Sequence, residues 1–190
     1  MGHFKSIINV NGNPYETLAD ILPYPIKNLD ILFIAKTPAT TSVEIGHYFQ
    51  GKHGKMFWNK LINHQLLTIK SGTYEDENFA SHNYGITDIV KVPRNYGNEP
   101  SQDEYRHGLE RILQTINSYK PKVLVFVYKT VLDNILKLEF NNSTKSVYGF
   151  NQNLESYFNS KVFVFPMPGT PCKKDQAKIS MTELQNFIKN

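Results

Sequence analysis

Residues 30–61 read DILFIAKTPATTSVEIGHYFQGKHGKMFWNKL. The run Ile31–Ile34 is short, apolar and bounded by polar residues, which is the pattern of a strand buried on both faces. The chain turns polar at Lys36, and a helical pattern begins near Lys55. Ligands of open α/β sheets bind beyond the carboxyl ends of the strands, so we expect chemistry in the loop that starts at Lys36. From position alone, an ordinary strand-to-helix connection is equally compatible.

The rest of the chain alternates strand and helix patterns. Apolar runs predict further strands over residues 85–90, 122–128 and 161–165. Helical spacing and two capping-box motifs predict helices over residues 55–67, 101–119, 130–138 and 180–188. This alternation predicts an α/β fold of three layers, with a central, mostly parallel sheet between two layers of helices.

Three further segments complete the predicted organisation. Residues 6–25 have apolar side chains at helical spacing, which predicts an amino-terminal helix. Residues 71–84 and 141–153 are polar and are predicted to be surface loops. The length of 190 residues suits one domain over residues 1–190.

Composition narrows the classes of function. The net charge of +4 and the pI near 9.0 permit a polyanionic partner without requiring one. A lone cysteine, Cys172, excludes an internal disulfide and any site built from four thiolates. No apolar run approaches the roughly 20 residues that span a bilayer, and no secretory leader is apparent. We therefore expect a cytoplasmic protein without a membrane partner.

Several common enzyme motifs are absent from the sequence: the phosphate-binding loop, the Gly-x-Ser-x-Gly nucleophile elbow and the His-Glu-x-x-His zinc pair. His47 and His53 are six residues apart in a predicted loop, a spacing without fixed metal geometry. We expect both histidines to be solvated, and we expect neither a metal site nor a cofactor.

Three polar loops follow the predicted strands: residues 36–55, 87–95 and 166–174. They should converge at one edge of the sheet, because parallel strands present their carboxyl ends on the same side. The first loop carries Tyr48 and Phe49 among lysines and histidines. Aromatic rings beside cations suit a ligand with a base and phosphates, since the base stacks and the phosphates are neutralised. The same composition also suits an ordinary surface loop.

Four segments, taken in order, resemble the mismatch-specific uracil/thymine-DNA glycosylases, a branch of the uracil-DNA glycosylase superfamily. They are FIAKTPATTSVEIGHYFQGKHGKMFWNKL, GITDIVKVP, VLVFVYK and VFVFPMPGTPCKK. The first is similar to that family's strand ending in Gly-Ile-Asn-Pro-Gly, followed by Gly-x-x-Phe and by Asn-x-Phe-Trp at a helix start. The last is similar to the segment that carries the family's helix-wedging loop. The similarity spans about residues 30–174.

The resemblance implies roles for individual residues. Thr37 lies at the position of the family's water-positioning Asn, and Pro38 matches its Pro. Phe49 lies where the family has the ring that stacks on the extruded base, and Phe57 and Trp58 match its helix start. Asp88 lies at a polar position of the family's pocket and is our candidate for activating the attacking water. The other candidates for the base pocket are Lys36, Tyr48 and His53.

The loop after the last strand is expected to contact DNA. The resemblance places residues 167–171 where the family has the loop that fills the gap left by the flipped nucleotide. The candidates for wedge or phosphate contacts are Lys55, Met167, Pro168, Gly169, Thr170, Pro171 and Lys173. The implied protein is a monomeric, monofunctional DNA glycosylase whose partner is double-stranded DNA with a damaged or modified base.

The departures from the family pattern favour an unusual substrate. Thr37 offers a hydroxyl where the family has an amide. Ala35 and Ala39 replace two glycines, and Lys36 replaces an apolar residue. We expect a uracil-like or modified pyrimidine, with a hydroxymethylated or glucosylated cytosine of phage DNA as the sharper hypothesis, which would make the protein part of antiviral defence.

Two alternatives stay open at this point. The first is a non-catalytic DNA-binding relative that has lost the motif Asn and keeps the groove. The second is a nucleotide-binding α/β protein unrelated to DNA, for which any affinity for a duplex would depend little on salt.

Overall fold

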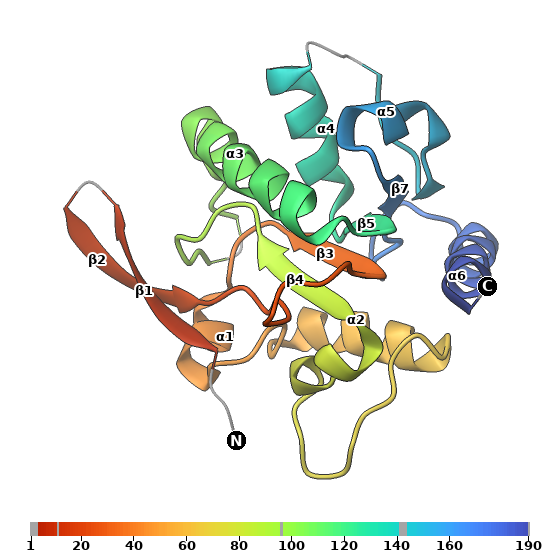
Figure 1. Cartoon of the computed structure of the whole chain (residues 1–190), viewed down its shortest axis with the longest axis horizontal. Helices are drawn as coiled ribbons and strands as arrows, with labels where there is room; N and C mark the ends of the chain where they lie inside the picture. The colour runs from red at the N-terminus through yellow and green to blue at the C-terminus, as the bar shows by residue number, and fades with distance from the viewer. Residues whose placement is uncertain (1–3, 11, 96, 141–143, 190) are drawn as a thin grey trace.

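A five-stranded sheet forms the centre of the computed structural model, which describes residues 4–10, 12–95, 97–140 and 144–189 (Figure 1). The strand order is β4-β3-β5-β7-β6. The strands, in chain order, are β3 (Ile31–Ala35), β4 (Tyr84–Asp88), β5 (Val123–Phe126), β6 (Gly149–Phe150) and β7 (Lys161–Val164). All adjacent pairs are parallel except β6 with β7, so the carboxyl ends of four strands share one edge.

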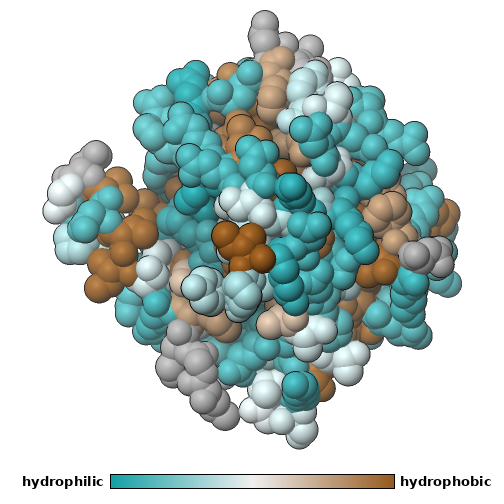
Figure 2. Space-filling model, viewed as in Figure 1, coloured by the Kyte–Doolittle hydropathy of each residue, from teal (hydrophilic) through white to brown (hydrophobic). Residues whose placement is uncertain are grey.

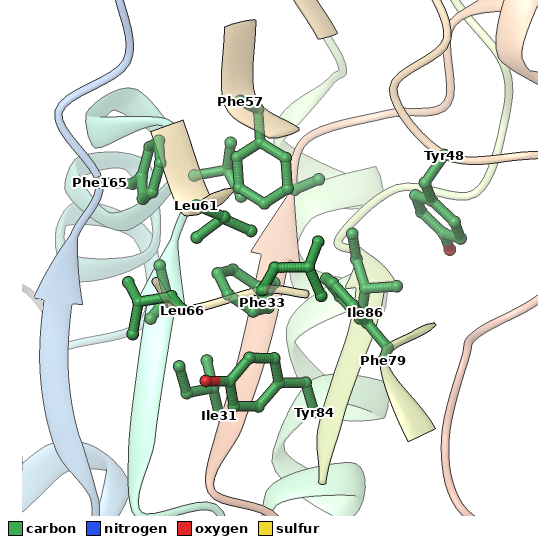
Figure 3. Close-up of a cluster of buried hydrophobic side chains, with 14 of the residues drawn as sticks. Ile31, Phe33, Tyr48, Phe57, Leu61, Leu66, Phe79, Tyr84, Ile86 and Phe165 are labelled. Atoms are coloured by element: carbon green, nitrogen blue, oxygen red, sulfur yellow. The ribbon is translucent and has the colours of Figure 1, made fainter. Parts of the chain in front are cut away.

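Helices cover both faces of this sheet. They are α1 (Thr40–Ile45), α2 (Lys52–Asn63), α3 (Gln102–Tyr119), α4 (Lys129–Glu139), α5 (Glu155–Phe158) and α6 (Lys174–Lys189). One core cluster joins the sheet to α1, α2 and α6, and the other joins it to α3, α4 and α5. Figure 3 shows the first cluster, where Phe33 of β3 lies among Phe57 of α2 and other buried rings. The predicted three-layer α/β fold is confirmed.

The predicted amino-terminal helix is wrong. Residues 5–18 form an antiparallel hairpin of β1 (Lys5–Val10) and β2 (Asn13–Leu18), which projects from the body of the molecule (Figure 1). Strands are favoured here because β-branched residues are frequent in β1, and because the turn includes Gly12 with a φ of 81°. Figure 2 shows hydrophobic side chains gathered on this hairpin, where Ile7 and Tyr15 are exposed.

Four other features differ from the prediction. Residues 71–84 include two 3-10 helices, Asp76–Asn78 and Ala80–His82, so this segment is more than a surface loop. Helix α6 begins at Lys174, and Ser180 lies buried in its interior instead of capping its start. Helix α2 ends at Asn63 rather than Leu67. Residues 149–150 form an edge strand within the loop predicted over residues 141–153. Residues 141–143 of that predicted loop lie outside the described residues. Local sequence motifs do not fix these element boundaries, because contacts with distant parts of the chain also decide where an element begins and ends.

Across the described ranges, no helix combines the length and apolarity needed to cross a membrane.

Candidate active site

The loops after β3 and β4 lie side by side at the carboxyl edge of the sheet. The Ile89 and Val90 amides donate to the Ala35 and Lys36 carbonyls at 2.9 and 3.0 Å, and the Arg94 amide donates to the Pro38 carbonyl at 3.0 Å. These bonds continue the β3–β4 pairing beyond its last register pair, Ala35 and Asp88. The strand order places the loop after β7 two strands away from β3. The predicted convergence of loops therefore holds most closely for those after β3 and β4.

Asp88 ends β4 and is buried, with 1% of its surface exposed. Burial raises the pKa of its carboxyl to about 6; Asp20 acts in the same direction, while Lys91 and Arg111 oppose the shift. Its Oδ2 atom has no hydrogen-bond partner among the described residues, and Lys91 Nζ lies 3.9 Å away. A carboxyl with a pKa near neutrality can accept or hold a proton under working conditions, which is what general-base catalysis requires.

Two tyrosines lie beside Asp88. The Tyr48 hydroxyl donates to the Ala19 carbonyl at 3.1 Å and accepts from Lys91 Nζ at 3.1 Å. Its ring is buried in the core (Figure 3), and the place of Tyr48 in a base pocket stays a prediction. Burial, with a contribution from Asp88, raises the pKa of Tyr128 to about 12, so this hydroxyl keeps its proton near neutral pH. Both phenols form part of the wall around the carboxyl.

Phe49 occupies an unusual backbone conformation, with a φ of 56°. Its half-buried ring lies 4.6 Å from the Phe57 ring and 5.9 Å from the Trp58 ring. Non-glycine residues with positive φ persist where surrounding structure enforces them, often at functional sites. The proposed stacking of Phe49 on a base stays a prediction.

A buried pair fixes the segment before Phe49. His47 is fully buried, and its Nδ1 atom lies 2.8 Å from Asp76 Oδ1. The Tyr48 amide donates to Asp76 Oδ2 at 2.7 Å, and the His47 ring stacks on Tyr74 with centroids 3.7 Å apart. The expectation of a solvated His47 is therefore wrong. Its partner lies 29 residues further on, in a segment whose sequence reads as a polar loop.

The remaining candidates of the first loop differ in exposure. Thr37 is half-buried and Pro38 is buried. Lys36 Nζ pairs with Glu99 Oε1 at 2.6 Å across the loop after β4. His53 and Lys55 are exposed on the first turn of α2, so His53 is solvated as expected.

The proposed wedge loop is anchored at its base. Lys60 Nζ donates to the Pro166 carbonyl at 2.5 Å, and Thr170 Oγ1 donates to the Met167 carbonyl at 2.6 Å. Met167 is packed in the core with 6% of its surface exposed, so its side chain is not available as a wedge in this conformation, and its contact with DNA stays a prediction. The exposed candidates for DNA contact are Gly169, Pro171 and Lys173, and Pro168 and Thr170 are half-buried.

A family model described as the uracil DNA glycosylase superfamily matches residues 23–176. The chain belongs to this superfamily. The matched range includes all five strands of the central sheet and the loops at its carboxyl edge. Uracil-DNA glycosylase-like proteins act on DNA, and superfamily members are generally DNA glycosylases. The match is to the superfamily as a whole and does not distinguish the mismatch-specific branch.

The site contains charged residues that the sequence did not single out. Asp20 follows β2, Lys91 follows β4 and Arg111 lies on α3. Lys91 could have been found from its place directly after a strand. Nothing in the sequence marks Asp20, because its segment reads as a helix and lies before the range that matches the superfamily. Arg111 reads as one of several charged residues on an amphipathic helix.

No group of three or more His, Cys, Asp or Glu side chains that could hold a metal occurs within the described ranges.

Gly54 allows α2 to approach Phe49. A Cβ atom on Gly54 would lie 2.2 Å from the Phe49 carbonyl oxygen and 2.4 Å from its carbon. We expect Gly54→Ala to lower the free energy of unfolding by about 1–3 kcal/mol, because neither backbone can move freely in this packed turn. Chemical denaturation measures the loss. Asn59→Ala, on the exposed face of the same helix, is the control and should change stability by less than about 0.5 kcal/mol. Equal effects of the two variants would contradict the steric account.

Proposed function

We propose that this chain is a DNA glycosylase that draws a base out of duplex DNA and hydrolyses its N-glycosidic bond, with Asp88 activating the attacking water. The observation that carries the proposal is the buried Asp88 carboxyl, whose pKa is raised. It lies at the carboxyl edge of the central sheet, within the range that matches the superfamily. It lies beside the loop after β3, where the sequence resembles the superfamily's first motif.

The proposed reaction requires few groups. Extruding a base costs on the order of a few kcal/mol in stacking and pairing, and stacking on an aromatic ring such as Phe49 returns about 1–3 kcal/mol. Bond cleavage leaves positive charge on the sugar and negative charge on the base. An ionised Asp88 takes a proton from water that attacks the sugar carbon. No covalent intermediate with the chain is needed, so the proposed enzyme is monofunctional.

The pH dependence follows from the same residue. The Asp88 carboxyl must be ionised to act as a base, and its pKa is about 6. The proposed rate of base release therefore rises as the pH rises through about 6 and then levels off.

We infer a uracil-like or modified pyrimidine as the substrate, and a hydroxymethylated or glucosylated cytosine of phage DNA as its sharper form. The hydroxyl of Thr37, a half-buried residue, and the ion pair of Lys36 with Glu99 support this inference, because they provide polar groups in the loop after β3. An enzyme with that substrate would act in antiviral defence.

Excision assays on separate duplexes test the function and the substrate together. The duplexes contain uracil, a thymine mismatch, hypoxanthine or glucosylated hydroxymethylcytosine. Formation of an abasic site in any of them supports the proposal, and the processed duplex identifies the substrate. Failure on all four would reject the enzymatic function.

A second candidate is a non-catalytic DNA-binding relative. The burial of Asp88 favours it, because a base with 1% of its surface exposed has little access to water in this conformation. The hydroxyl of Thr37, in place of the amide expected from the resemblance, also favours it. Such a protein binds duplex DNA and releases no base.

Thr37→Ala provides a graded test of the proposed enzyme. We expect base release to slow by about 3- to 10-fold, the cost of one lost hydrogen bond to water, while the Kd for the duplex is unchanged. Single-turnover kinetics and DNA titrations measure the two quantities. Thr41→Ala is the control, since Thr41 is exposed on the neighbouring α1. A Thr37→Ala variant with the wild-type rate would show that this hydroxyl has no part in the reaction.

A further inference from the structure

We propose that Lys91 is a positioning residue of the active site, whose ammonium, held by the end of the amino-terminal hairpin and the residues directly after it, sets how readily Asp88 releases its proton. This inference rests on the proposed function only in assigning Asp88 to the reaction. The position of the Lys91 ammonium follows from the contacts of Lys91 and does not depend on the proposed function.

Three anchors hold the Lys91 ammonium. Nζ lies 2.5 Å from Asp20 Oδ1, and it donates to the Leu18 carbonyl at 2.9 Å and to the Tyr48 hydroxyl at 3.1 Å. From this position it lies 3.9 Å from Asp88 Oδ2, and 14% of the Lys91 side chain is exposed. An ammonium has three donors, and these contacts use all of them. The charge therefore lies opposite the carboxylate at a fixed distance instead of moving through solvent.

Two cations lie around Asp88, and Lys91 has the larger effect on its carboxylate. Arg111 of α3 donates to the Asp88 main-chain carbonyl, to Asp20 Oδ2 at 2.9 Å and to Thr87 Oγ1 at 2.8 Å. Its charge is thus shared between Asp20 and neutral acceptors. The phenols of Tyr48 and Tyr128 also face Asp88, and both keep their protons because burial raises the pKa of each. The site then contains two carboxylates and two cations.

Two of the three anchors of Lys91, the Leu18 carbonyl and the Asp20 carboxylate, lie outside the superfamily match. Leu18 and Asp20 precede residue 23, where the matched range begins. Their segment is fixed to the site, because Thr17 Oγ1 donates to the Lys91 carbonyl at 2.5 Å and Ile21 bridges Ile86 of β4. Figure 1 shows the hairpin projecting beside the strand that ends in Asp88. The end of the hairpin and the residues directly after it thus supply two of the three groups that fix the position of the Lys91 charge.

The sign of each effect follows from simple electrostatics. An opposite charge within about 4–6 Å lowers the pKa of a carboxyl by about 1–3 pH units. Removing the Lys91 ammonium should raise the Asp88 pKa by that amount. Neutralising Asp20 should lower it, because a negative neighbour disappears while both cations remain. A general loosening of the structure would not shift the two variants in opposite directions.

The experiment uses the full chain with Lys91→Met, Lys91→Arg or Asp20→Asn. Carbon-13 NMR of the Asp88 carboxyl gives its pKa directly, and single-turnover base release gives the acidic limb of the rate profile. We expect Lys91→Met to raise the Asp88 pKa and the midpoint of the acidic limb by about 1–3 pH units, and we expect both values in Lys91→Arg to stay close to wild type. Asp20→Asn should lower the Asp88 pKa and the midpoint of the acidic limb. Lys122→Met, at an exposed ion pair with Asp30, should change neither.

The two readouts separate this inference from the proposed function. If the carboxyl pKa is the same in Lys91→Met and wild type, or if Asp20→Asn does not lower it, the positioning role is wrong even when base release is intact. If no variant and no wild-type protein releases a base, the proposed function fails, and the NMR titration still decides whether Lys91 controls the protonation of Asp88.

Discussion

Asp88→Asn is expected to slow base release by about 10²- to 10⁴-fold and, at pH 8, to make the protein more stable. The amide has the shape of the carboxyl but cannot accept the proton of the attacking water. Duplex affinity should change little, because the side chain is buried beneath the surface that would face DNA. Loss of rate combined with a gain in stability is the signature of a residue retained for chemistry.

The gain in stability follows from the raised pKa. The ordinary carboxyl pKa of 3.8 describes the unfolded chain, and the folded value is about 6. The folded protein binds the proton more tightly, so the contribution of Asp88 is fully favourable below pH 3.8 and is lost as the pH rises through about 6. At pH 8 the ionised group costs roughly 3 kcal/mol, which the neutral Asn avoids. At pH 3 the two proteins should have similar stability.

Thermal unfolding at pH 3 and pH 8 checks this prediction together with single-turnover kinetics. Asp103→Asn, at an exposed acid in the first turn of α3, is the control and should not reproduce the stabilisation at pH 8. An Asp88→Asn protein that is less stable than wild type at pH 8 would show that the carboxylate is a structural partner of Lys91. In that case the non-catalytic candidate gains support.

Asp76→Ala is expected to have the largest effect on stability. The variant removes the acceptor of the Tyr48 amide and the partner of His47 Nδ1, and both groups are buried. A buried polar group left without its partner costs about 1–3 kcal/mol, so the two together should cost about 2–6 kcal/mol. For a chain of this length, the Tm should fall by between about 5 and 20 °C. Phe49 follows this segment directly, so we also expect slower base release below the Tm.

Calorimetry measures the fall in Tm, and Glu44→Ala is the matched control. Glu44 is an exposed acid on α1, and its replacement should change stability by less than about 0.5 kcal/mol. Asp76→Asn should lie between Asp76→Ala and wild type, because its amide oxygen can still accept one of the two hydrogen bonds. A wild-type Tm for Asp76→Ala would contradict the role assigned to the buried pair.

The four parallel strands of the central sheet could be predicted because they are short apolar runs such as Ile31–Ile34, separated by amphipathic helices, whereas the two-residue edge strand β6 could not. Each of these signals is local, and the capping box at Ser101 is an example that the structure contains in full. The family resemblance placed Asp88 and the loop at Lys36 in one region for the same reason, since both follow a strand directly.

Features that depend on distant contacts could not be predicted. The hairpin over residues 5–18 has apolar residues that fit a helix as well as a strand, and tertiary packing decides between them. The sequence predicts a solvated His47, whereas the fold places Asp76 beside it. The sequence predicts an exposed Met167 in a loop, whereas the fold packs it in the core. Asp20 and Lys91 are separated by 70 residues in the chain, and the fold brings them within 2.5 Å.

The most direct test of the account is a single-turnover assay of base release by wild type and Asp88→Asn on the four duplexes. We predict that wild type forms an abasic site in at least one duplex, at a rate that rises through about pH 6, and that Asp88→Asn binds the same duplex without releasing the base. An Asp88→Asn protein as active as wild type, or a wild type that leaves every duplex intact, would contradict the central claim.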